Sequence, residues 1–282
     1  MQESTNKIFN HLKIHTQYSI CEGAIKIEDL KSYCKDNKIK SLGLSDTSNL
    51  CGSLEFSENL AKSGTQPIIG TQILINYNGE FGLLPLIAKS ESGYRKIIEL
   101  SSKSYLDNLE TSGPQCKLEY LLENPEGVIL FSGSISGLIG KLFNKGKLSE
   151  VEEIYKIFKK NYKDNFYIEI QRHNDSNEKS FENFNLNLSS KLNLPIIATQ
   201  EIYYLDKSMH DAHEALICIG QKTYLNDKNR ISFSNQHYFK SSAEMNKLFS
   251  DLPEALENNY NFPLRCGFRP IPSKPILPNI SS

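Results

Sequence analysis

The chain has 282 residues, of which 39% are hydrophobic and 23% charged, with a formal net charge of -1 and a pI near 6.6. This length allows one large α/β domain or two ordinary ones, each with a buried core. The near-neutral charge argues against a surface that is wholly a nucleic-acid clamp, so a role at DNA is expected to be indirect.

Targeting signals and cysteine motifs are not expected in this sequence. The start of the chain lacks the basic residues and long apolar run of a secretory signal, and no apolar segment reaches the length of a membrane span. We therefore expect a cytoplasmic protein that has no membrane partner. The six cysteines form no C-x-x-C pair, so we expect reduced and mostly buried thiols, Cys51 included.

The first expected strand, residues 9–16, alternates apolar and polar residues. In a strand, residues two apart share a face, so His11, Lys13 and His15 point together. A protonated lysine has no lone pair to give to a metal. A metal centre on this strand would need a His-x-His pair, and Lys13 stands where the first histidine of that pair is needed. The face is therefore unsuited to a metal centre.

Strands and helices alternate along the rest of the chain, which is the pattern of right-handed β-α-β units. Further strands are expected at residues 41–46, 67–76, 81–88, 128–131, 166–171 and 194–199. Helices are expected at residues 27–34, 53–62, 94–105, 118–123, 148–162, 180–192, 209–220, 242–249 and 254–260. Residues 269–282 are rich in proline and are typical of a linker or a lead-in to another region.

Polar residues recur late in the expected strands or just after them. In α/β barrels the carboxyl ends of the strands carry the functional site. The residues in this position are His15, Asp46, Gln72, Ser134, His173 and Glu201.

Three other patterns have simple structural interpretations. His210 and His213 lie one helical turn apart, but no Glu or Cys stands at the right spacing to complete a ligand set. The glycine-rich stretch that ends at Lys141 fails as a phosphate loop, because Leu142 stands where Ser or Thr is needed. The lysines of helix 148–162 are flanked by acidic residues, which favours a solvated face over a DNA contact.

The spacing of the strand ends resembles that of a known protein family. The segments that carry the match are 11–19, 44–52, 67–70, 130–133, 195–205, 211–214 and 252–258. In number and order they resemble the N-terminal polymerase-and-histidinol-phosphatase (PHP) domain of bacterial DNA polymerase III alpha subunits, from Asn10 to about Pro278. The resemblance implies an α/β fold built as a distorted seven-stranded (β/α) barrel of the PHP type over residues 1–268. Residues 269–282 would then be a Pro-rich lead-in to an absent polymerase palm region.

The resemblance also implies a depleted metal centre. Family members with an intact centre hold up to three metals through nine side chains. Of these positions, His15, Asp46 and His173 are retained here and Glu201 is a conservative replacement. The substituted positions are Lys13, Thr47, Gln72, Ser134 and Tyr203.

We hypothesise that Lys13 replaces the lost metal charge and pairs with Asp46 or Glu201, because a carboxylate left alone in a barrel mouth would be costly. No catalytic residue, metal or other cofactor is then expected. The alternative is a single divalent metal, since three surviving ligands can hold one zinc.

For function, the resemblance implies a non-catalytic domain that supports the rest of the polymerase alpha chain and docks the proofreading exonuclease subunit. The parent polypeptide would be a DNA-directed DNA polymerase, which is a nucleotidyltransferase, with its catalytic carboxylates outside these residues. The alternative is a metal-dependent phosphoesterase or 3′-5′ exonuclease that uses a reduced metal site. A free-standing phosphatase of the histidinol-phosphate type is a third possibility.

Overall fold

The first of two sheets is parallel throughout and contains the strand at the start of the chain. The computed structural model describes residues 7–107 and 113–274, so the expectations for residues 1–6 and for the tail beyond Lys274 lie outside the described residues. The strand order is β11-β1-β2-β4. These strands are β1 (His11–Ile14), β2 (Ser41–Leu44), β4 (Gln66–Ile68) and β11 (Glu201–Ile202).

The second sheet is mixed and has the order β10-β9-β8-β6-β5-β3, with β7 paired to β5. β6 runs antiparallel to both β5 and β8, and the other pairs are parallel. Asn78 and Gly79, both with positive φ, form the tight turn between β5 and β6. The strands are β3 (Asp46–Thr47), β5 (Gly70–Tyr77), β6 (Glu80–Ala88), β7 (Cys116–Lys117), β8 (Val128–Phe131), β9 (Phe166–Ile170) and β10 (Ile196–Ala198).

Three chain segments take part in both sheets. β2 continues into β3 after Ser45, β4 into β5 after Ile69, and β10 into β11 after residues 199–200. The α/β class is confirmed, but among the described residues the strand pairing gives one parallel and one mixed sheet instead of one closed ring. The ladders are interrupted where each of these three segments passes from one sheet to the other.

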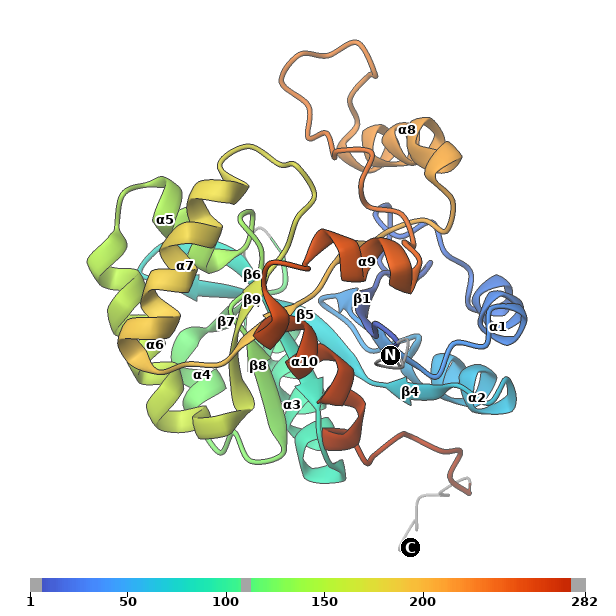
Figure 1. Cartoon of the computed structure of the whole chain (residues 1–282), viewed down its shortest axis with the longest axis horizontal. Coiled ribbons are helices and arrows are strands. Elements are labelled where there is room, and N and C mark those ends of the chain that lie inside the picture. The colour runs from blue at the N-terminus through green and yellow to red at the C-terminus, as the bar shows by residue number, and fades with distance from the viewer. Residues whose placement is uncertain (1–6, 108–112, 275–282) are drawn as a thin grey trace, which may run out of the picture.

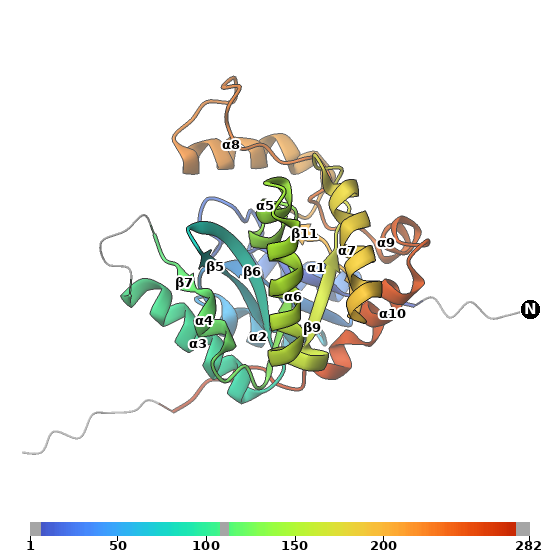
Figure 2. The ribbon, with the colours of Figure 1, turned by 90° about the vertical axis from the view of Figure 1, so that its left-hand side faces the viewer.

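Helices surround the sheets (Figures 1 and 2). They are α1 (Ile27–Asp36), α2 (Ser53–Lys62), α3 (Glu91–Leu106), α4 (Leu118–Leu122), α5 (Leu138–Asn144), α6 (Leu148–Tyr162), α7 (Glu178–Leu192), α8 (His210–Gln221), α9 (Ser242–Leu248) and α10 (Pro253–Asn261). Each expected helix is present. In α6 the residues Val151, Ile154, Tyr155 and Phe158 form the expected buried stripe.

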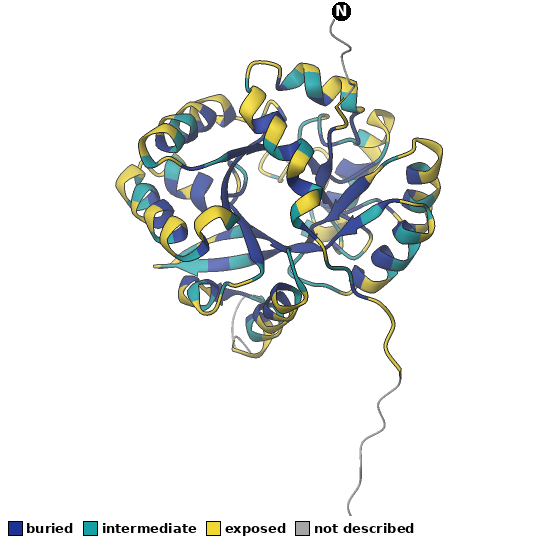
Figure 3. Cartoon of the chain, turned by 60° about the horizontal axis from the view of Figure 1, so that its bottom comes forward, coloured by how far each residue is buried: buried dark blue, intermediate teal, exposed yellow. Residues whose placement is uncertain are grey.

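The inner faces of the two sheets share a core. Leu12, Ile87, Ile129 and Ile197, which come from strands of both sheets, pack in one buried cluster with Phe262. Figure 3 shows these buried strands at the centre, with helices around them whose outer faces are exposed. The strand ends next to this core are therefore shielded from water.

All six cysteines are free thiols, and four of them are buried. The expectation that Cys51 is buried was wrong. Cys51 lies exposed in the turn before α2, where its backbone N–H donates to Asn49 Oδ1. Among the described helices, none combines the length and apolarity needed to cross a membrane.

Candidate functional site

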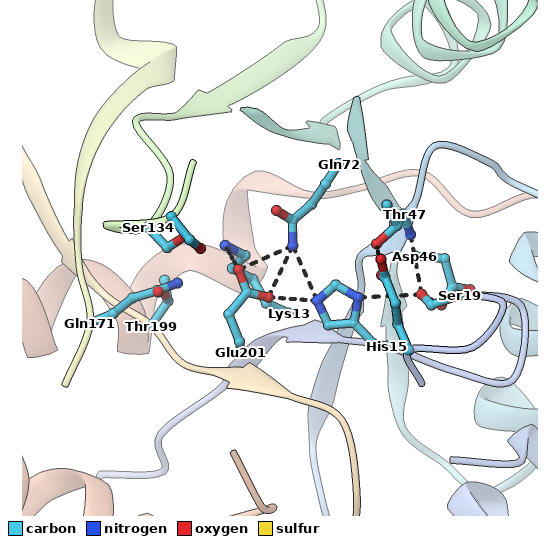
Figure 4. A network of polar contacts seen from close by, with 12 residues as sticks. Lys13, His15, Ser19, Asp46, Thr47, Gln72, Ser134, Gln171, Thr199 and Glu201 are labelled. Atoms are coloured by element: carbon cyan, nitrogen blue, oxygen red, sulfur yellow. Dashed lines mark hydrogen bonds and ion pairs between the residues drawn. The ribbon is translucent and has the colours of Figure 1, made fainter. Parts of the chain in front are cut away.

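Lys13 lies at the centre of a buried ionic cluster (Figure 4). Its Nζ forms an ion pair with the Glu201 carboxylate and lies 3.2 Å from Glu169 Oε1. The parallel register of β1 and β11 sets Lys13 opposite Glu201, and Glu169 comes from β9 of the second sheet. The side chains of Lys13 and Glu169 are at most 1% exposed. The cluster therefore joins the two sheets through charge in a site closed to solvent.

The electrostatics of the cluster favour the charged forms. Burial opposes the ammonium of Lys13, but Glu169 and Glu201 outweigh it and raise the pKa of Lys13. Burial likewise opposes the Glu201 carboxylate, but Lys13 and His15 outweigh burial and hold the pKa of Glu201 well below its usual range. The ion pair thus stays charged at neutral pH.

Hydrogen bonds satisfy the second carboxylate, Glu169. Thr199 Oγ1 donates to Glu169 Oε1, and Gln171 Nε2 donates to the same oxygen over 2.9 Å. Two acidic groups share one ammonium here, so these neutral donors offset the remaining negative charge. The carboxylate is occupied by partners within the protein and has no oxygen turned to solvent.

His15 and Gln72 hold Glu201 from the other side. His15 Nε2 lies 2.5 Å from Glu201 Oε2, and Gln72 Nε2 donates to the same oxygen over 2.9 Å. Lys13, His15 and Gln72 therefore all contact Glu201 directly, as positions predicted from the sequence. The Tyr203 ring stacks on the His15 ring, with centroids 4.3 Å apart.

Asp46 stands apart from Lys13. Its carboxylate accepts hydrogen bonds from Thr16 N and Thr16 Oγ1, at 2.7 and 2.8 Å, and from Ser19 Oγ at 2.7 Å. The structure therefore pairs Lys13 with Glu201, as hypothesised, and not with Asp46. Three donors already stabilise the Asp46 carboxylate, so it needs no nearby cation. Ser19 Oγ also lies 3.3 Å from His15 Nδ1, which links Asp46 to the cluster.

Two substituted positions bond to their own neighbours. Thr47 Oγ1 donates to Glu22 Oε2 over 2.6 Å, and Ser134 Oγ lies 2.9 Å from Ser136 Oγ. Among the described residues, neither is hydrogen-bonded to Lys13 or to its carboxylates. Both therefore lie at the edge of the cluster.

His173 is held by protein groups at both ring nitrogens. Its Nε2 accepts from Glu201 N over 3.1 Å, and its Nδ1 lies 3.2 Å from Glu178 Oε1. Burial lowers the pKa of His173 to about 3 and raises the pKa of Glu178 to about 7. A neutral ring with both nitrogens engaged has no lone pair left for a metal.

A second group of possible ligands lies beside the cluster. The ligand atoms of His173, Asp175 and His237 lie within 4.8 Å of one another. His237 is 3% exposed, and neither of its ring nitrogens has a hydrogen-bond partner among the described residues. A buried imidazole without a hydrogen bond is what a metal site would offer, so this group is the best support for the single-metal alternative.

The geometry of that group does not fit a shared ion as it stands. The rings of His173 and His237 are stacked at 4.1 Å with an interplanar angle of 6°. Imidazole lone pairs lie in the ring plane, so those of two parallel rings do not converge on one ion at about 2.0–2.1 Å. With His173 engaged elsewhere, His237 and Asp175 remain as the available ligands.

The sequence reasoning missed several of the residues that complete the site. Glu169 stands inside a fully buried strand, and a charged residue in such a strand signals a buried partner. Thr16 and Ser19 follow β1 and were recognisable only as part of a motif. His237 lies in a long loop after α8, where no local pattern indicates that it returns to the site.

The chain is similar to a known domain family and to several known proteins. The PHP domain family model matches residues 11–173. A DNA polymerase III subunit alpha from Rickettsia prowazekii is 38% identical over 275 residues, which cover 97% of this chain and 23% of the relative. One from Caulobacter vibrioides is 34% identical over 287 residues, which cover 99% of this chain and 25% of the relative. The chain thus spans about a quarter of the length of these relatives.

A solved structure described as a metal-dependent phosphoesterase, from Bifidobacterium adolescentis, is also similar. It has 9% sequence identity and a TM-score of 0.48, and the match covers 68% of this chain and 86% of that one. The family model covers more than half of the present chain, including Lys13, His15, Gln72 and Glu169. The chain therefore belongs to the PHP domain family.

Proposed function

We propose that this chain is the PHP domain of a replicative DNA polymerase III alpha subunit and that the domain itself is non-catalytic. Its role would be to support the polymerase part of the subunit and to dock the proofreading exonuclease subunit. Nucleotidyl transfer would belong to other parts of a cytoplasmic alpha chain, and this domain would meet DNA only indirectly. Nearly the whole of this chain matches about a quarter of each of two alpha subunits, which supports this assignment.

The observation that most supports a non-catalytic role is the position of Lys13. Clustered divalent metals need several anionic or imidazole ligands, and a metal-bound hydroxide requires the metal. Here an ammonium lies between Glu169 and Glu201, so a cation would have to displace it from both carboxylates. The cluster is also buried, with the Glu201 side chain only 6% exposed, which keeps a phosphodiester away from it.

We further infer that the two sheets together form the distorted barrel of the PHP type. The continuation of β2 into β3, of β4 into β5 and of β10 into β11 links the sheets at both edges. The core cluster shared by their inner faces supports the same arrangement. An experimental structure at high resolution would test it through the pairing on either side of Ser45 and of residues 199–200.

The second candidate function is a metal-dependent phosphoesterase that works with one ion. The group of His173, Asp175 and His237 favours it, because His237 is buried without a hydrogen-bond partner among the described residues. The stacked rings and the engaged nitrogens of His173 count against it. A reaction at that site would require the rings to separate first.

Metal analysis of the purified chain separates the two functions. We expect substoichiometric zinc, manganese and iron, and no chelator-sensitive hydrolysis of a phosphodiester substrate. Stoichiometric metal together with hydrolysis that EDTA abolishes would contradict the non-catalytic proposal. His237→Phe and His15→Phe would then show which group holds the ion, because each removes the nitrogen ligands of one group while keeping an aromatic ring.

A further inference from the structure

A cavity of about 580 Å³ opens at the amino ends of β8 and β9, away from the Lys13 cluster near the other ends of the strands. Its walls come from the residue after β6, the turn before β8, the end of α6 with the short helix η1 (Lys163–Asn165), and the last residue of the short helix η3 (Phe262–Arg265). Apart from Pro125 and Tyr162, the lining residues are charged or carry an amide. Small-molecule sites have volumes of about 300–1,000 Å³, so this cavity has room for a hydrophilic ligand.

Two half-buried cations meet in this cavity. Arg265 Nη2 donates to Asn165 Oδ1 over 2.7 Å, and Lys89 Nζ lies 3.5 Å from the same oxygen. The sum of these two distances limits the separation of the nitrogens to about 6 Å. Like charges this close repel each other, and more strongly where the protein shields them from bulk water. A neutral amide oxygen therefore stands at the point where an anion would stabilise both cations.

Within the described part of the chain, no carboxylate is paired with either cation. The cavity does have two carboxyl side chains, Glu126 and Asp164, but both residues are exposed and neither forms an ion pair with Lys89 or Arg265. An exposed carboxylate is screened by water and salt, so it offsets a half-buried charge only weakly. The positive charge inside the cavity is thus left for a ligand to neutralise.

A structural role explains Arg265 but not Lys89. Arg265 Nη1 donates to Asp164 O over 2.8 Å and to the Tyr167 hydroxyl, which satisfies a carbonyl just after α6. The carboxyl end of a helix carries partial negative charge, so a cation is favoured there. One arginine is enough for this role, and the role does not require Lys89 to approach the same amide.

The two cations also have hydrogen-bond donors to spare. A guanidinium has five N–H donors, and the contacts described above use three of them in Arg265. The other two have no partner among the described residues. The ammonium of Lys89 has three donors, and within the same residues Asn165 Oδ1 is its one hydrogen-bond partner. Arginine and lysine with free donors are well suited to a phosphate group, which offers several acceptor oxygens.

We propose that this cavity binds the phosphate group of a small hydroxylated molecule, with Lys89 and Arg265 contacting the phosphate. The amide side chains of Asn124 and Asn161 line the same cavity and can bond to hydroxyl groups. The site is separate from the Lys13 cluster, so the inference does not depend on whether that cluster holds a metal.

The test measures the binding of inorganic phosphate and of ribose 5-phosphate to the purified chain by calorimetry at constant ionic strength. Lys89→Met is expected to weaken the binding of both at least tenfold. The matched control is Lys160→Met, which removes the same charge from an exposed position on α6 outside the cavity. We expect the control to bind like the unmodified chain, and ribose 5-phosphate to bind more tightly than inorganic phosphate.

Asn165→Asp tests the site in the opposite direction. The change keeps the shape of the side chain but places a carboxylate where Lys89 and Arg265 meet. This built-in anion should raise the melting temperature and abolish phosphate binding, because the two cations are then paired within the protein. A loss of binding together with a higher melting temperature cannot be the result of unfolding.

Several results would overturn the proposal. One is the absence of binding of either ligand to the unmodified chain at millimolar concentrations. Another is an equal loss of affinity in Lys89→Met and Lys160→Met, which would show a general effect of charge. Phosphate binding by Asn165→Asp at the strength of the unmodified chain would also contradict the site. If inorganic phosphate bound as tightly as ribose 5-phosphate, the assigned role of Asn124 and Asn161 would be wrong.

Discussion

At the scale of single residues, Lys13 offers a direct measure of what the buried ion pairs contribute. In Lys13→Met the side chain keeps its length and loses its charge, so Glu169 and Glu201 stay buried without a cation. Breaking a buried pair by removing one partner costs about 3–5 kcal/mol. We expect the free energy of unfolding to fall by about that amount, measured by urea denaturation followed by circular dichroism.

A compensated variant serves as the control for Lys13→Met. Adding Glu169→Gln and Glu201→Gln removes the unpaired charges, and replacing a whole buried pair by neutral groups of similar volume is often tolerated. The triple variant should therefore regain part of the lost stability. A loss below about 1 kcal/mol in Lys13→Met alone would show that the ammonium is not needed to hold the carboxylates in place.

The buried histidines predict a loss of stability in acid. Burial lowers the pKa of His11 to about 4 and that of His173 to about 3, and it lowers the pKa of His237 well below its usual value. A folded pKa below the unfolded value of 6.5 means that the contribution is complete above pH 6.5 and is lost as the pH falls. Burial raises the pKa of Asp175 to about 6 and that of Glu178 to about 7, which acts in the opposite direction.

Three histidines outweigh two carboxyl groups in this balance. We expect the urea midpoint to decrease between pH 6.5 and pH 4.5, with a further loss below pH 4.5 as Glu201 is protonated. His237→Phe keeps an aromatic ring but cannot titrate, so its midpoint should depend less on pH than that of the unmodified chain. An equal slope for both proteins would rule out His237 as a contributor.

At the scale of elements, the close approach of β1 and β2 places Lys13 in the cluster. Gly43 of β2 permits it, because a Cβ there would stand 2.4 Å from Leu12 O. Gly43→Ala should force the strands apart and cost about 1–3 kcal/mol, as overpacking of a core does. Thermal unfolding followed by circular dichroism would measure the loss.

Gly267→Ala provides the comparison for Gly43→Ala. A Cβ at Gly267 would meet nothing within 4 Å, and its φ is not in the left-handed region. We expect a change within about 0.5 kcal/mol, as for an ordinary surface substitution. If both variants melted at the temperature of the unmodified chain, β1 and β2 would be able to accommodate a methyl group at Gly43 without loss of stability.

The helices and long strands were predictable because each carries its own periodicity. The apolar spacing of α6 and the continuous apolar run of β8 stand out in the sequence alone. The short helix α5 was missed, because it starts after a glycine-rich stretch. Gly140 is needed there for packing, since a Cβ would come within 2.1 Å of Ile135 O.

The site was predictable only in part, because its contacts join distant positions. The family resemblance suggested that Lys13 pairs with Asp46 or Glu201, and the register of β1 and β11 places Lys13 beside Glu201. Nothing local indicates that Glu169, on the strand β9, also reaches Lys13, or that Asp46 is satisfied by Thr16 and Ser19. Such pairings depend on how the sheets meet, and a single sequence does not record that.

At the scale of the whole molecule, Arg172 joins three separate segments. Its guanidinium makes two hydrogen bonds to Glu182 of α7, both 2.8 Å long, and others to Asp251 and to Leu248 O. Glu182 has a side chain only 3% exposed. Arg172→Ala leaves that carboxylate without its main partner, so we expect a loss of about 2–3 kcal/mol in the free energy of unfolding.

An exposed pair on α3 gives the contrast for Arg172. Arg95 and Glu91 form an ion pair at 2.7 Å, but their side chains are 75% and 61% exposed. Pairs of this kind contribute about 0.3–0.5 kcal/mol because water and salt screen them. Urea denaturation of Arg172→Ala and Arg95→Ala should show a clearly larger loss in the free energy of unfolding for Arg172→Ala. Similar losses for the two variants would show that the contacts of Arg172 contribute no more than an exposed ion pair.

The pairing of β1 with β11 also bears on how the chain is made. Translation delivers Lys13 almost two hundred residues before Glu201, so β1 leaves the ribosome without β11, one of its two neighbours. Nascent chains stalled before Ile202 should accordingly stay sensitive to protease near β1. Chains stalled well past it, once the strand has left the exit tunnel, should become resistant.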